Sequence, residues 1–143
     1  MTTLTQDNSA AIQNGSSITA QDGIAFGSRL LLAAIFLIMG FGKIGAAEGT
    51  IGYIASVGLP FAEAVYYGTV ALELIGGVLL VIGFKTRLLA IALGLFTLAA
   101  AVIFHADFGD QAQFTTFLKN LAIAGGMFQV AAFGPGRLSL DRG

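Results

Sequence analysis

Four long apolar runs, separated by short polar segments, dominate the pattern of hydrophobic and polar positions. The runs cover about residues 24–42, 64–84, 88–105 and 115–133. Each is close to the length of about 20 mostly apolar residues that a helix needs to cross a bilayer. None shows the apolar–polar alternation of a transmembrane β-strand. The pattern therefore predicts an all-α fold, an integral membrane four-helix bundle formed by residues 23–134.

The composition supports a lipid environment. Of the 143 residues, 56% are hydrophobic and 10% are charged, against about 25% charged residues in a soluble domain. The net charge of −1 gives no basic face for nucleic acid, so we expect no nucleic-acid partner. The chain has no cysteine and one histidine, His105, and this excludes a disulfide, an iron–sulfur cluster and a two-histidine haem. We therefore expect no metal site and no covalent cofactor.

Polar tails and one longer linker flank the apolar runs. Residues 1–22 are rich in Thr, Ser, Gln and Asn and contain no Lys or Arg, which predicts a disordered tail rather than a secretory signal. Residues 135–143 form a C-terminal tail. The semi-apolar segment 44–63 is either an ordinary loop or, as we favour, an amphipathic segment that lies on the membrane surface and caps the bundle.

The positively charged residues are distributed unequally between the two ends of the predicted spans. One end holds Arg29, Lys85, Arg87, Arg137 and Arg142, and the other holds Lys43 and Lys119. Cytoplasmic segments carry the excess of Lys and Arg in membrane proteins. This distribution therefore predicts that both termini are cytoplasmic.

A weak internal repeat relates the two halves of the bundle. The sequence of residues 29–34 resembles that of 87–92, and the sequence of 72–77 resembles that of 121–126. Two hairpins related by an axis along the membrane normal would produce this pattern. Small residues let membrane helices approach closely, so we predict that the glycine pairs in the repeat are packing contacts. These pairs are Gly76 with Gly77 and Gly125 with Gly126.

Glu73 lies near the middle of the second apolar run. An Asp, Lys or Arg at the centre of a membrane helix costs about 2.5–3.5 kcal/mol, so an intramembrane ionisable group indicates a functional site. Other polar residues end or begin the runs in the same half of the bilayer, namely Lys43, His105, Lys119 and Asn120. We predict that these five side chains surround an apolar cavity that binds a ligand or moves a proton, with Glu73 at its floor.

Each of these residues also has a structural interpretation. Glu73 could form an ion pair with Lys43 or Lys119 that fixes the helix register, or it could be protonated. The two lysines could extend to the interface without a further role. His105 could be an ordinary hydrogen-bonded histidine, and Asn120 could form a hydrogen bond between helices.

The order and spacing of several motifs resemble the DoxX family of small four-helix bacterial inner-membrane proteins. The resemblance covers about residues 28–142. Its motifs are Arg29 with the run into Gly40-Phe41-Gly42-Lys43, Gly58-Leu59-Pro60, Glu73 with Gly76-Gly77, Gly83 with Thr86-Arg87, Lys119-Asn120 before Gly125-Gly126, and the ending Gly134-Pro135-Gly136-Arg137-Leu138-Ser139-Leu140-Asp141. The resemblance implies a bacterial inner-membrane protein linked to redox physiology, because the family includes a subunit of a thiosulfate:quinone oxidoreductase and proteins associated with oxidative or thiol stress.

The resemblance and the predicted cavity together suggest a quinone-interacting or redox-complex-associated subunit of a membrane oxidoreductase. In this hypothesis Lys43, His105 or Lys119 donates a hydrogen bond to a quinone oxygen, and Glu73 takes up or releases a proton. A quinone or the cofactor of a partner carries the electrons. Candidate contacts of the quinone ring are Phe36, Phe104 and Phe117. No catalytic residue is assigned.

Two other functions remain open on the sequence. A non-catalytic scaffold or assembly factor for a membrane protein complex needs no cofactor, and the glycine-rich faces would contact its partner. A small-solute or proton-coupled carrier is the third hypothesis, although four spans are few for alternating access unless two copies share a pathway. The partners that these hypotheses imply are the lipid bilayer, a membrane redox subunit and a second copy of the chain.

Overall fold

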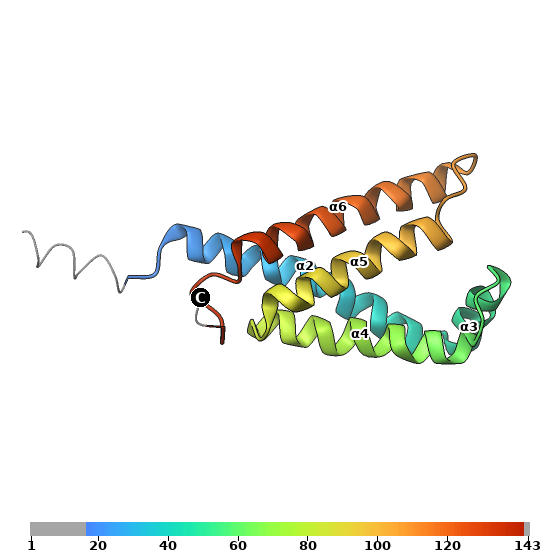
Figure 1. Cartoon of the computed structure of the whole chain (residues 1–143), viewed down its shortest axis with the longest axis horizontal. Helices are drawn as coiled ribbons and strands as arrows, with labels where there is room; N and C mark the ends of the chain where they lie inside the picture. Colours follow the sequence, from blue (N-terminus) through green and yellow to red (C-terminus); the bar gives the residue numbers. More distant parts are fainter. Residues whose placement is uncertain (1–16, 142–143) are drawn as a thin grey trace, which may run out of the picture.

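The chain folds into a bundle of helices, and no strand occurs within residues 17–141, the part that the computed structural model describes (Figure 1). This architecture confirms the predicted all-α fold. Residues 1–16, most of the predicted N-terminal tail, lie outside the described residues, and so does Arg142. The helices are α2 (Ala20–Gly45), α3 (Ala47–Ser56), α4 (Ala62–Ile82), α5 (Thr86–Phe104) and α6 (Gln111–Phe133).

Three of the described helices, α2, α4 and α5, are long and apolar enough to cross a membrane. They confirm that the protein is a helical membrane protein. Helix α6 has 23 residues, but it is not among the three, because polar side chains interrupt its apolar surface. These side chains are Gln113, Lys119, Asn120 and Gln129. The fourth span therefore stays a prediction, and so does the internal repeat.

Local hydrogen bonds explain where α2 begins. The Oγ1 atom of Thr19 accepts a hydrogen bond from the backbone N–H of Asp22 at 3.3 Å, and Oδ2 of Asp22 accepts one from the backbone N–H of Thr19 at 2.9 Å. This capping box supplies partners to backbone donors that have none within the helix. The helix consequently begins at Ala20, so residues 20–22 of the predicted tail are helical.

The segment 44–63 contains helix α3, which lies at one end of the bundle between α2 and α4 (Figure 1). Its Ile54 is 4% exposed. The Tyr53 hydroxyl donates to the carbonyl oxygen of Phe104 at 3.0 Å, and the two rings lie 5.5 Å apart. We call this end the α3 end. The opposite end, with the α4–α5 turn and the ends of the described chain, is the terminal end.

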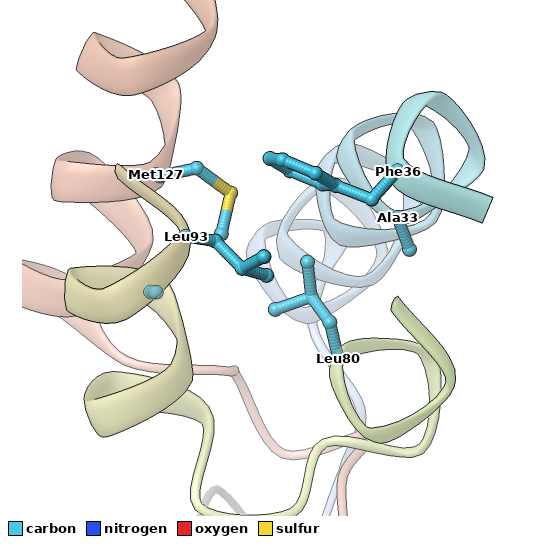
Figure 2. Close-up of a cluster of buried hydrophobic side chains, with 6 residues drawn as sticks. Ala33, Phe36, Leu80, Leu93 and Met127 are labelled. Atoms are coloured by element: carbon cyan, nitrogen blue, oxygen red, sulfur yellow. The ribbon is translucent and has the colours of Figure 1, made fainter. Parts of the chain in front are cut away.

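The four long helices form two antiparallel hairpins, α2 with α4 and α5 with α6, and these pairs have the most extensive contacts in the bundle. Helices α4 and α5 are joined by a short turn at the terminal end and separate toward the α3 end (Figure 1). A cluster of buried side chains fills the space between the hairpins (Figure 2). We call this cluster the core plug, and it consists of Ala33, Phe36, Leu80, Ala90, Leu93 and Met127.

Three of the four glycines in the predicted pairs lie against a neighbouring helix. A Cβ atom on Gly77 would lie 2.8 Å from a methyl carbon of Leu37, and one on Gly126 would lie 3.2 Å from a methyl carbon of Leu32. A Cβ atom on Gly76 would make an ordinary contact of 3.5 Å with a side chain of α5. The small residues therefore allow α2 to approach both α4 and α6.

The prediction that Gly125 is a packing contact is wrong, because no atom outside its own stretch of helix lies within 4 Å of the position that its Cβ atom would take. Gly125 precedes Gly126 by one position on the helix and so points about 100° away from it. Gly40, which the repeat does not single out, has closer neighbours. Its Cβ atom would lie 2.7 Å from Leu74 and 3.3 Å from the Cβ atom of Glu73. Helices α2 and α4 thus approach each other closely beside Glu73.

Replacing Gly40 with valine is expected to lower the free energy of unfolding by about 1–3 kcal/mol, because the added side chain overpacks the α2–α4 contact. The matched variant Gly125→Val adds the same side chain where nothing lies within 4 Å, and we expect a change of about 0.5 kcal/mol or less. Unfolding in mixed detergent micelles measures both. Equal losses in the two variants would contradict the close approach at Gly40.

The C-terminal residues 134–141 fold back over the terminal end of the bundle instead of extending away from it. The backbone N–H groups of Leu140 and Asp141 donate to the carbonyl oxygens of Ile82 and Gly83 at 3.1 and 2.8 Å, respectively. These bonds satisfy two carbonyl groups at the end of α4 that have no partner within the helix. We call residues 134–141 the C-terminal strap.

Arg29 anchors the C-terminal strap. Its side chain is fully buried, with 0% of its surface exposed. The Nη1 atom donates to the carbonyl oxygen of Pro135 at 2.6 Å, and Nη2 donates to the carbonyl oxygens of Leu138 at 2.7 Å and Val81 at 3.2 Å. The charge pattern marks Arg29 only as a positive residue at a span end. The structure assigns it a further role, because it connects α2, α4 and the strap.

Asp141 caps α5 from the strap. Its carboxylate accepts hydrogen bonds from the backbone N–H of Lys85 at 2.8 Å and of Thr86 at 2.6 Å. The side chain of Lys85, the residue before α5, makes no capping hydrogen bond itself. The backbone hydrogen bond from Thr86, together with that from Lys85, holds the pKa of the Asp141 carboxyl below its usual value. The strap thus supplies the N-terminal cap that α5 otherwise lacks.

Replacing Asp141 with asparagine is expected to remove a pH-dependent part of the stability. Since the folded-state pKa is lowered, the carboxylate stabilises the fold fully above the usual Asp pKa of about 3.9, and this contribution is lost as the pH falls through the folded-state pKa. The free energy of unfolding should therefore exceed that of Asp141→Asn at neutral pH, and the difference should shrink in acid. Unfolding of the detergent-solubilised proteins across pH measures this. A difference that is independent of pH would contradict it.

Candidate functional site

A cavity of about 370 Å³ lies between the two hairpins at the α3 end. Small-molecule sites in proteins have volumes of about 300–1,000 Å³. The five polar side chains that we predicted to surround a cavity are all in its wall. The lining residues come from all five described helices and from the residue after α5, and they are Ile35, Phe36, Met39, Lys43, Thr50, Tyr53, Ile54, Thr69, Glu73, Phe96, Thr97, Ala100, Phe104, His105, Thr116, Lys119, Asn120 and Ile123.

Glu73 and Lys43 form an ion pair in this wall. The Nζ atom of Lys43 lies 2.8 Å from Oε1 and 2.9 Å from Oε2 of Glu73. The side chain of Glu73 is 5% exposed and that of Lys43 is 27% exposed. The two residues meet because Gly40, one turn before Lys43, lets α2 approach α4 closely. Of the two partners considered for Glu73, the structure pairs it with Lys43, whereas Lys119 is exposed.

Tyr66 holds the backbone that carries Lys43. Its hydroxyl donates to the carbonyl oxygen of Lys43 at 3.1 Å, and the residue is 5% exposed. Tyr66 precedes Glu73 by two helical turns and therefore lies on the same face of α4. The last turn of α2 is thus attached to α4 at two points, by the ion pair and by this hydrogen bond.

His105 lies in the wall immediately after the end of α5. Its Nδ1 atom is 2.6 Å from the side-chain oxygen Oε1 of Gln113 at the start of α6. With an amide oxygen as the partner, Nδ1 carries the proton, and Nε2 of the neutral ring is an acceptor. His105 is thus hydrogen-bonded, as its structural interpretation predicts, and it is also part of the cavity wall. Sequence reasoning did not identify Gln113, because only the folded loop between the helices brings the two residues together.

Three of the four threonines of the wall, Thr50, Thr97 and Thr116, use their hydroxyl protons within their own helices and so can only accept hydrogen bonds from a ligand. Their hydroxyl groups donate to the carbonyl oxygens of the preceding helical turn, from Thr50 to Ala46, from Thr97 to Leu93 and from Thr116 to Ala112, at 2.7–2.9 Å. The donors that the wall offers to a ligand are therefore the amine and amide groups of Lys43, Lys119 and Asn120 and the hydroxyl group of Thr69. Within residues 17–141, no three His, Asp or Glu side chains are grouped so that they could hold a metal ion.

The phenylalanines predicted to contact a ring are placed differently from one another. Phe36 and Phe104 lie in the wall, but Phe117 does not. Phe117 instead packs edge-on against Phe108, with ring centroids 5.0 Å apart. The structure therefore corrects the prediction for Phe117, because α6 presents the neighbouring helical positions to the cavity. Phe96, two turns before Phe104 on the same face of α5, lies in the wall and was not predicted.

Comparisons with known proteins identify relatives over most of the chain. It is 36% identical over 115 residues to "Inner membrane protein YqjF" of Escherichia coli, covering 80% of this chain and 87% of that protein. It is 38% identical over 120 residues to "Inner membrane protein YphA" of the same organism, covering 80% and 86%. It is 37% identical over 107 residues to "Putative oxidoreductase CatD" of Bacillus subtilis, covering 70% and 78%. No solved structure matches the chain.

The sequence profile of the DoxX family matches residues 24–106. This range runs from α2 to the end of α5 and contains Lys43, Glu73 and His105. Together with the three apolar helices, the relatives indicate a multi-pass protein of the bacterial inner membrane. The chain belongs to the DoxX family.

Proposed function

We propose that the cavity binds the head group of a membrane quinone and that the protein acts as a subunit of a membrane redox system. The observation that carries this proposal is the Lys43–Glu73 ion pair in the wall of an apolar cavity of about 370 Å³ inside a membrane bundle. The printed name of one relative, "Putative oxidoreductase CatD", supports a redox setting. The cavity combines apolar walls with a few polar groups, which is typical of small-molecule sites.

The hydrogen-bond donors of the wall suit the two oxygens of a quinone ring. The ammonium group of Lys43 contacts both oxygens of Glu73 and has three N–H donors, so one remains for a ligand. Lys119 and Asn120 provide donors from α6, on the other hairpin. A quinone between the hairpins would accept hydrogen bonds at both of its oxygens. Phe36, Phe96 and Phe104 line the same space and would contact the ring.

Reduction of a bound quinone would take its protons and its electrons from different groups. Reduction of a quinone to a hydroquinone consumes two electrons and two protons. Glu73 is the carboxyl group of the wall, so it would transfer one proton to or from the quinone oxygen that Lys43 contacts, and water at the outer surface would exchange the second proton with the other quinone oxygen. The chain has no cysteine and a single histidine, so the electrons would come from the cofactor of a membrane redox partner.

The proposed topology has four spans, with α6 as the fourth and both termini in the cytoplasm. The exposed cations of the terminal end, Lys85, Arg87 and Arg137, support this orientation, because cytoplasmic segments are enriched in Lys and Arg. The cavity then lies in the outer half of the membrane. This location would allow exchange with quinone in the bilayer and with protons at the outer surface.

A quinone titration tests the proposal. The purified protein is delipidated, and ubiquinone and menaquinone are titrated separately while their binding is measured. We expect saturable binding of one of them, and we expect Glu73→Gln to weaken it about tenfold or more, the equivalent of one charge-assisted hydrogen bond. The matched control is Glu63→Gln, an exposed glutamate on the same helix, which should bind like the wild type. Absence of binding, or equal binding by both variants, would contradict the proposal.

A further inference from the structure

We infer that the cavity opens to one aqueous face of the membrane, the face at the α3 end, and that the core plug and the C-terminal strap seal it from the other face. The inference concerns the same cavity as the proposed function but does not depend on what the cavity binds. It assigns a role to the C-terminal strap, residues 134–141, which is the last of the motifs noted in the sequence. It also distinguishes a binding site from the alternating pathway of a carrier.

The first argument is the position of the cavity along the bundle. The lining residues of the long helices come from the half nearer the α3 end or from the middle of the helix, and the deepest positions are Ile35 on α2, Glu73 on α4 and Ile123 on α6. The charged and ionisable groups of the rim lie at helix ends. Lys43 precedes the end of α2 by two residues, and His105 directly follows α5. These positions lie at the level of the interface with water, so the rim is at the α3 face.

The second argument is the core plug beneath the cavity. Phe36 belongs to both the cavity wall and the plug, so the plug begins where the cavity ends. Leu80, Leu93 and Met127, from three different helices, are each 0% exposed and point toward one another with Phe36 (Figure 2). Close-packed apolar side chains leave no room or polar partners for a chain of water molecules. The plug therefore blocks passage toward the terminal end.

The third argument is that hydrogen bonds join the helices more extensively at the terminal end. Arg29 binds carbonyl oxygens of α4 and of the strap, and the strap continues directly from α6. Asp141 of the strap caps α5, and the backbone N–H of Arg137 donates to Asp22 of α2 at 3.1 Å. At the α3 end, by contrast, the described residues contain one hydrogen bond between the hairpins, from Tyr53 to Phe104. Hydrogen bonds thus hold the two hairpins together more firmly at the terminal end than at the α3 end.

Thiol labelling tests the inference, because the chain has no cysteine of its own. Single cysteines are placed in the cavity wall (Thr69→Cys and, separately, Thr116→Cys) and on the exposed surface at each end (Glu48→Cys on α3 and Lys85→Cys at the α4–α5 turn). A membrane-impermeant maleimide is applied to membrane vesicles of each orientation. The two surface cysteines identify the face that is exposed in each preparation.

We expect both wall cysteines to react from the face that labels Glu48→Cys, and to react about tenfold or more slowly from the face that labels Lys85→Cys, since labelling there requires opening of the packed end. Labelling at equal rates from both faces would overturn the inference. Absence of labelling from either face would overturn it as well, because the cavity would then have no aqueous opening. A failed quinone titration would leave these labelling rates unchanged, so the two proposals are tested separately.

A second variant tests the part played by the strap. Arg29→Gln is introduced into the Thr69→Cys variant. We expect the labelling rate of this cysteine from the face that labels Lys85→Cys to rise about tenfold, because the C-terminal strap loses its hydrogen bonds to Arg29. An unchanged circular dichroism spectrum shows that the variant is folded, since an unfolded protein would also be labelled from the face of Glu48→Cys. Arg87→Gln, at an exposed arginine of the same end, serves as the matched control. An unchanged rate in the folded Arg29→Gln variant would overturn the role of the strap.

Discussion

Replacing Arg29 with glutamine is expected to lower the free energy of unfolding by about 3 kcal/mol or more. The buried guanidinium donates to three carbonyl oxygens, those of Val81, Pro135 and Leu138, and a hydrogen bond to a charged group contributes about 1.5–3 kcal/mol. The shorter, neutral amide of glutamine cannot reach all three acceptors. The variant therefore leaves buried carbonyl groups without a partner and releases the strap from α2.

Unfolding in mixed detergent micelles, followed by circular dichroism, measures the change. Arg87→Gln is the matched control, because Arg87 lies at the same end of the bundle but is exposed, and we expect a loss of about 0.5 kcal/mol or less there. Arg29→Lys is informative as well. It keeps the charge but loses the planar fork that binds several carbonyl groups at once, so it should recover only part of the lost stability. Similar losses at Arg29 and Arg87 would refute the anchoring role.

The helical elements could be predicted because they follow from local patterns. The runs predicted at 64–84 and 88–105 correspond to Ala62–Ile82 and Thr86–Phe104, since a long apolar run in a bilayer has few alternatives to a helix. The polar residues of the cavity were also predictable, because a charged residue is costly in a membrane and three- to four-residue spacing fixes the face on which it lies. Glu73 and Lys43 follow from this reasoning.

Other features depend on contacts that no local pattern contains. Arg29 looks like an interfacial charge in the sequence, and its burial depends on acceptors 52 to 109 residues away. Gln113 binds His105 only through the geometry of the intervening loop. Phe117 and Gly125 each lie next to a residue that faces the bundle, and an error of one position rotates a helical side chain by about 100°. The surroundings of each of these residues are set by tertiary packing and not by the local sequence.

The ion pair in the cavity wall gives the other large expected effect. Lys43→Met is expected to lower the free energy of unfolding by about 3–5 kcal/mol, because it leaves the carboxylate of Glu73 in a buried site without its partner. The double variant Lys43→Met/Glu73→Gln removes both charges and should recover most of this loss, since uncharged side chains of similar size often replace a buried ion pair at little cost. Unfolding of the wild type, the two single variants and the double variant gives the coupling energy of the pair.

The same proteins separate a structural role of the pair from the proposed one. If Lys43 and Glu73 only fixed the position of α2 against α4, the stable double variant would bind quinone like the wild type. We expect instead that its affinity for quinone falls about tenfold or more while its stability is recovered, because the donor and the proton-exchanging group are both lost. A quinone titration of the double variant measures this, with Lys85→Met/Glu63→Gln as an exposed control pair. If a double variant of recovered stability bound quinone with wild-type affinity, the ion pair would have only a structural role. The main support for a quinone site would then be lost.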